Sequence, residues 1–110
     1  MGLDIGQAQW SYPRFAKFRQ ELAEFEGIVL SEMCGYGGTT PWEEYPTELR
    51  PLLDHSDCDG DLAPQECAQV AGRLQQLLPS LSDEYDRANG DVLIREMLQA
   101  AWRGERLPFR

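Results

Sequence analysis

The chain has 110 residues, 42% of them hydrophobic, and a formal net charge of −9. That length suits a single domain, 1–110, with one core, and the three Trp, four Tyr and four Phe residues argue against disorder. No apolar run approaches the roughly 18 residues that span a bilayer, and no basic region precedes a hydrophobic one at the N-terminus. We therefore expect a soluble cytoplasmic protein that does not bind membranes.

The negative charge is concentrated between Pro41 and Glu66. Eight acidic residues and one base, Arg50, give this segment −7 of the total −9. The acidic residues are Glu43, Glu44, Glu48, Asp54, Asp57, Asp59, Asp61 and Glu66. Such a segment repels nucleic acid phosphates, so no direct nucleic acid binding is expected. It can attract cations or a basic protein surface, and a solvated face without a ligand is the alternative.

The first predicted helix follows an N-terminal segment, residues 1–10, without periodicity. Ser11 can cap free backbone amides and Pro13 is tolerated in a first turn, so a helix should begin there and end at Gly27. Its apolar stripe is Phe15, Phe18, Leu22 and Phe25. A stripe with this spacing is typical of a side packed on the core.

Two short helical segments are predicted next. One covers residues 28–33, and the other begins at Thr40-Pro41-Trp42-Glu43, which has the pattern of a capping box. The glycine-rich run 34–38 between them lacks the Gly-Lys-Ser/Thr that a phosphate-binding loop needs, so it is interpreted as a turn. Pro46 and Pro51 interrupt any longer helix before residue 54.

Residues 55–66 carry the one spacing that points to specific chemistry. Asp57, Asp59 and Asp61 alternate, Gly60 lies among them, and Glu66 follows five residues after Asp61. Oxygen ligands at these positions, with a glycine for the sharp bend, suit a hard divalent cation. This stretch resembles an EF-hand calcium loop. The resemblance implies Ca²⁺ ligands at Asp57, Asp59, Asp61 and Glu66, with His55 at the first position.

The loop departs from that pattern in several places. His55 stands where an aspartate is usual, Ala63 offers no oxygen at the ninth position, and Pro51 breaks the incoming helix. One alternative is a Zn²⁺ site made from His55 and the three cysteines, although their spacing matches no strong zinc pattern. Another is a metal-free loop in which Asp61 and Glu66 neutralise free amides at a helix start. The cysteines are Cys34, Cys58 and Cys67, which we expect to be reduced.

The strongest helical periodicity follows this loop. A helix is predicted from Pro64 to Leu78, because proline suits its first turn and apolar residues recur every three or four positions. A short helix over residues 83–87, a break or a kink at Asn89-Gly90 and a last helix from Asp91 to Gly104 should follow. The tail is expected to be irregular, with Leu107 and Phe109 docked on the core.

These elements predict an all-α fold, a small irregular bundle of about five helices. Catalysis gains little support, since His55 is the only histidine and the cysteines near it lie among carboxylates that raise thiol pKa values. We expect a non-catalytic interaction module, of the inhibitor or immunity-protein type, that binds a basic protein surface. The residues expected to contact the partner are Trp42, Glu43, Glu44, Tyr45 and Glu48. The alternative is a cation-binding module that uses the 55–66 loop.

Overall fold

A computed structural model describes residues 2–110. Its α-helices are α1 (Tyr12–Phe25), α2 (Arg50–Leu53), α3 (Pro64–Leu77) and α4 (Glu84–Arg103). Its 3₁₀ turns are η1 (Leu30–Glu32), η2 (Trp42–Glu44) and η3 (Leu78–Ser80). Two antiparallel sheets of two strands complete it, β1 (Gly2–Ile5) with β2 (Ala8–Ser11) and β3 (Asp61–Leu62) with β4 (Leu107–Pro108). None of the helices within residues 2–110 is both long and apolar enough to cross a membrane.

The predicted all-α bundle of five helices is wrong, because the fold mixes helices with two small sheets. The largest error lies at the N-terminus, where a β-hairpin replaces the expected irregular segment. Leu3, Ile5, Ala8 and Trp10 point into the core, and their neighbours in the strands are exposed. Gly6 has a φ of 60° at the first position of the two-residue turn, as a type II′ hairpin turn requires.

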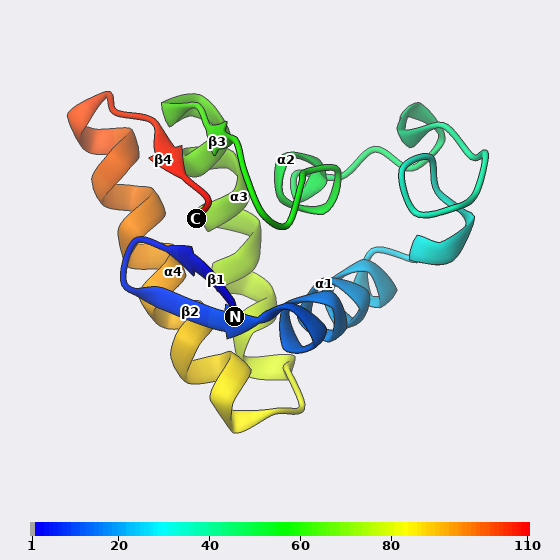
Figure 1. The fold of residues 1–110 in the computed structure, drawn as a ribbon, viewed down its shortest axis with the longest axis horizontal. Helices are drawn as coiled ribbons and strands as arrows, with labels where there is room; N and C mark the ends of the chain where they lie inside the picture. Colours follow the sequence, from blue (N-terminus) through cyan, green and yellow to red (C-terminus); the bar gives the residue numbers. More distant parts are fainter. Residues whose placement is uncertain (1) are drawn as a thin grey trace.

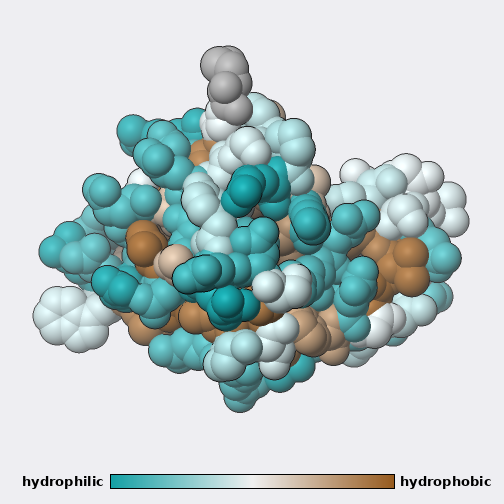
Figure 2. Space-filling view, turned by 90° about the horizontal axis from the view of Figure 1, so that it is seen from below, coloured by the Kyte–Doolittle hydropathy of each residue, from teal (hydrophilic) through white to brown (hydrophobic). Residues whose placement is uncertain are grey.

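Helices α3 and α4 lie side by side, the hairpin packs against α4, and α1 packs against the hairpin (Figure 1). Where these elements meet, the Trp10 ring stacks on Phe18 with centroids 4.7 Å apart and lies 5.5 Å from Phe15. The Trp10 indole N–H donates to the carboxylate of the buried Asp86 at 3.0 Å. The core therefore joins the hairpin to both α1 and α4. On the surface seen in Figure 2, hydrophilic side chains predominate and apolar atoms form separate groups.

The long helices follow their sequence signals. Ser11 caps α1 by accepting from the Arg14 amide at 3.3 Å, α3 begins at the predicted Pro64, and Gly104 ends α4 with a φ of 67°. The predicted break at Asn89-Gly90 is wrong, since α4 runs through it without interruption. A Cβ at Gly90 would lie 2.6 Å from Leu78 Cδ1, so this glycine allows η3 to approach the helix.

Residues 28–48 form a lobe that projects beyond the end of α1, away from α3 and α4 (Figure 1). The two helices predicted there are only the 3₁₀ turns η1 and η2, and no side chain caps η2 at Pro41. Instead, the lobe is closed by its own backbone bonds. The Cys34 amide donates to the Thr40 carbonyl at 3.0 Å, and the Thr40 amide donates to the Glu32 carbonyl at 2.9 Å.

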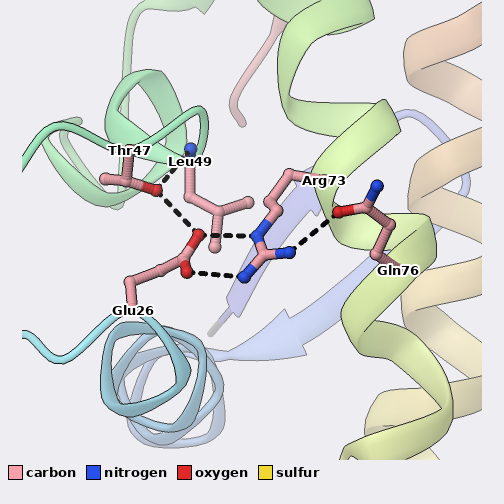
Figure 3. A network of polar contacts seen from close by, with 5 residues as sticks. All are labelled: Glu26, Thr47, Leu49, Arg73 and Gln76. Carbon is pink, nitrogen blue, oxygen red and sulfur yellow. Dashed lines mark hydrogen bonds and ion pairs between the residues drawn. The ribbon is translucent and has the colours of Figure 1, made fainter.

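A polar network fixes the base of this lobe (Figure 3). Glu26, directly after α1, accepts two hydrogen bonds of 2.8 Å from Arg73 on α3. The same carboxylate accepts from the Thr47 hydroxyl at 2.9 Å, and the Leu49 amide donates to that hydroxyl at 3.0 Å. The hydrogen bonds to Arg73 are the main reason that the pKa of Glu26 is lowered, because they favour the charged form. One carboxylate therefore joins α1, α3 and the end of the lobe.

Candidate functional site

The candidate site is built around residues 54–61, which connect α2 to β3. Arg19 reaches this loop from α1 and donates through Nη1 to the carbonyls of Leu52, Leu53 and His55, at 3.3, 3.5 and 2.6 Å. Two of these carbonyls belong to the end of α2, where backbone acceptors lack helical partners. The guanidinium therefore orders the start of the loop.

His55 lies inside the loop and holds its two ends together. Its Nδ1 is 2.7 Å from the Ser56 carbonyl and its Nε2 is 3.0 Å from the Asp61 carbonyl. Its ring packs on Phe109 with centroids 4.0 Å apart, and the Phe109 amide donates to the Gly60 carbonyl at 2.9 Å. Both ring nitrogens therefore contact backbone carbonyls of the loop itself.

The middle of the loop is a tight turn made by local hydrogen bonds. The Ser56 hydroxyl accepts from the Cys58 and Asp59 amides at 3.2 and 3.4 Å. Gly60 has a φ of 82°, the left-handed conformation that glycine adopts without steric cost. The bend predicted at this glycine is therefore present.

The last two predicted calcium ligands already have partners in the protein. Asp61 accepts from Arg106 Nε at 2.8 Å, which ties the loop to the segment before β4. Glu66 accepts from the Ala63 amide at 2.8 Å and so caps α3. This is the role that the metal-free alternative gave to Glu66.

The remaining predicted ligands do not converge. Asp57 and Asp59 form no ion pair, and no three His, Cys, Asp or Glu side chains within residues 2–110 are grouped as a metal site would need. For the zinc alternative, Cys34 and Cys58 are exposed whereas Cys67 is buried on α3. Burial raises the pKa of the Cys67 thiol to about 11, which disfavours a thiolate ligand. Calcium binding stays a prediction.

A cavity of about 450 Å³ lies between this loop, α1 and the lobe. Arg19 lines it together with Tyr36, Asp54, His55 and Asp57. The Arg19 side chain is only 5% exposed, and its Nε is buried without a hydrogen-bond partner in residues 2–110. Burial lowers the pKa of Arg19, and the nearby Tyr36 and Asp57 oppose that shift. The cavity therefore has a buried cation in its wall.

Tyr36 brings the lobe to the same cavity. Its hydroxyl donates to the Leu53 carbonyl at 2.5 Å, and its ring lies 5.4 Å from the Arg19 guanidinium carbon. Burial raises the pKa of the Tyr36 hydroxyl, so it stays protonated and keeps this bond at neutral pH.

The residues predicted to contact a partner separate into two groups. Trp42 is only 3% exposed and donates through Nε1 to the Cys34 carbonyl at 3.1 Å, so it supports the lobe from within. Glu43, Glu44 and Glu48 are exposed, and Tyr45 is 39% exposed. Glu43 pairs with Arg50 at 3.1 Å. The acidic side chains and Tyr45 are thus the parts of the predicted surface that a partner can reach.

Arg19 and Tyr36 were not predicted as site residues. Arg19 carried one signal, because it falls four residues after Phe15 and three before Leu22, within the apolar stripe of α1. A charged residue in such a position must find buried acceptors. Tyr36 carried no comparable signal, since it lies in a glycine-rich turn whose position depends on the whole fold.

Comparisons with known protein families, with curated proteins and with solved structures found no match for this chain. No activity can therefore be transferred from a relative. Function is therefore inferred from the side chains that this fold places together.

Proposed function

We propose that this protein is a non-catalytic interaction module that binds a basic protein surface through the acidic face of its lobe, made of Glu43, Glu44, Tyr45 and Glu48. The observation that carries the proposal is the charge of the projecting segment. Residues 28–48 contain four glutamates and no lysine or arginine. Like-signed charge on a protruding surface steers an oppositely charged partner toward it and selects against acidic ones.

The construction of the lobe supports this proposal. Trp42 inside it, the backbone bonds across it and the Glu26–Arg73 network at its base hold in one arrangement the backbone that carries the acidic side chains. A surface that is ordered before binding loses less conformational entropy in a complex. Tyr45 adds an exposed aromatic ring, a side-chain type enriched among residues that dominate binding energy.

The environment of His55 supports the non-catalytic part of the proposal. Both nitrogens of this single histidine face backbone carbonyls, and the buried Cys67 thiol has a raised pKa. General acid–base and thiolate chemistry both need a group that can exchange a proton with a substrate.

A charge-reversal experiment tests the acidic face. The wild-type chain and the E43K/E44K/E48K variant are used as bait in a lysate of the source cells, and captured proteins are identified. We expect the wild type to retain a basic protein and the variant to lose it, with an affinity reduced at least about tenfold, because like charges then oppose each other.

The matched control is E24K/E84K/E105K, which changes the net charge equally at exposed residues outside the lobe. This variant should retain the partner, and circular dichroism should show that both variants are folded. Equal capture by the wild type and the lobe variant, or equal loss in both variants, would exclude the acidic face as the binding surface.

Divalent-cation binding by the 55–66 loop is the second candidate. It is favoured by the left-handed Gly60 where a calcium loop has its glycine, and by Asp57 and Asp59, which form no ion pair in residues 2–110. Full coordination would also require Asp61 to leave Arg106 and Glu66 to leave the Ala63 amide. Thermal unfolding in millimolar calcium and in excess EDTA tests it. A midpoint higher by several degrees with calcium supports binding, and identical curves exclude it.

A further inference from the structure

Arg19 is a buried cation without a carboxylate partner. Within residues 2–110 it forms no ion pair, and its contacts are three carbonyl oxygens and the rings of Phe15 and Tyr36. Buried arginines are usually paired with an acidic group, because removing a charge from water costs free energy that carbonyl dipoles offset only in part. Its Nε lacks a hydrogen-bond partner in residues 2–110, and the side chain lines the cavity, where an anionic group would lie beside the guanidinium.

The other charges of the cavity limit what that anion can be. Asp54 and Asp57 also line the cavity, so a ligand with two or more negative charges would be repelled. Asp54 pairs with Arg50 at 3.5 Å, whereas Asp57 forms no ion pair or side-chain hydrogen bond in the described part of the chain. Asp57 is therefore the carboxylate that is free to receive a positive group of the ligand.

Size and shape agree with a small molecule. A cavity of about 450 Å³ falls within the range of about 300–1,000 Å³ typical of ligand pockets. The Tyr36 ring offers an aromatic wall, which suits an ammonium group or an apolar side chain.

We propose that this cavity binds a free α-amino acid as its zwitterion. The ligand carboxylate pairs with the Arg19 guanidinium, whose planar donors match a carboxylate, and the ligand ammonium pairs with Asp57. The site is distinct from the acidic face of the lobe. Its occupancy does not depend on a protein partner.

Thermal unfolding and NMR titration of the full chain test the proposal with defined probes. These are glycine, L-alanine and L-leucine, with acetate, methylamine and inorganic phosphate as fragments or competitors. At about ten times its dissociation constant, a bound amino acid should raise the unfolding midpoint by about 5 °C and shift the ring resonances of Tyr36. Acetate should act more weakly, and methylamine and phosphate should have no effect.

The Asp57→Asn variant separates ligand recognition from folding, because Asp57 forms no ion pair or side-chain hydrogen bond in the described part of the chain. In this variant the response to the amino acids should fall to the level seen with acetate. The matched Asp59→Asn variant, two residues away and outside the cavity lining, should respond like the wild type. The proposal is overturned if none of the three amino acids has an effect, if phosphate binds more tightly than they do, or if D57N responds like the wild type.

Discussion

Asp86 is a buried carboxylate in the hydrophobic core, where it accepts the Trp10 indole N–H. Burial raises its pKa above the ordinary value of 3.8, and the bond from Trp10 opposes that shift. The charge is tolerated because Asp86 lies in the first turn of α4, where the helix dipole favours an anion. This residue joins the hairpin to α4 with one hydrogen bond.

Replacing Asp86 tests that connection. D86A leaves the buried indole N–H without an acceptor and should lower the free energy of unfolding by about 1–3 kcal/mol, measured by urea denaturation. D86N keeps an acceptor and should lose less. Equal losses in the two variants would show that the hydrogen bond to Trp10 is not what stabilises this contact.

The same pair gives a pH dependence. Because the folded pKa of Asp86 is raised, its contribution to stability is complete below the unfolded pKa and is lost as pH rises through the folded pKa. Wild type should therefore lose stability relative to D86N as the pH increases from about 3.8 upward. A constant difference between the two proteins across this range would contradict the assignment.

At the scale of elements, the Glu26–Arg73 network joins α1 to α3 and closes the base of the lobe. Its contribution to stability changes with pH in the opposite direction to that of Asp86. The folded pKa of Glu26 lies below its ordinary value of 4.5, so the stabilisation is present above that value and is lost as pH falls through the folded pKa.

The E26Q variant should accordingly unfold at a lower temperature than wild type at neutral pH, and the two should converge at low pH, where Glu26 is protonated in both states. Scanning calorimetry at both pH values measures this. A difference that persists unchanged at low pH would mean that the substitution acts through packing and not through the ion pair.

The helices with clear 3.6-residue periodicity and terminal signals, α1 and α3, could be predicted from the sequence. The hairpin could not, since its alternating residues cover only four positions on each side of Gly6 and a run this short is ambiguous. Glycine usually indicates a helix break, but Gly90 lies inside α4 because Leu78 packs where a side chain at that position would stand. Such contacts depend on tertiary structure.

The candidate site was predicted only in part, for the same reason. The bend at Gly60 and the helix cap at Glu66 involve residues close in sequence, so both could be predicted from the sequence. Asp61, by contrast, pairs with Arg106, 45 residues away, and Arg19 contacts a carbonyl 36 residues away. No sequence spacing indicates which distant cation a carboxylate will meet.

At the scale of the whole molecule, charge is distributed unevenly along the fold. The lobe and the 54–61 loop together contain eight acidic residues and no lysine or arginine, whereas Arg95, Arg103, Arg106 and Arg110 lie in α4 and the C-terminal tail. Arg106 and Phe109 return from this tail to hold the acidic loop. The loop is therefore stabilised by the basic end of the chain, and the lobe remains free to present its charge.

Binding of the captured partner at two salt concentrations tests the central claim most directly. Between about 0.1 M and about 1 M salt the Debye length falls from about 10 Å to about 3 Å, so a contact made by exposed carboxylates should weaken. Calorimetric titration should show that the wild type loses at least about tenfold in affinity at the higher salt concentration. The E43K/E44K/E48K variant should bind weakly at both concentrations. An affinity that is independent of salt and equal in the two proteins would contradict an electrostatic contact through the lobe.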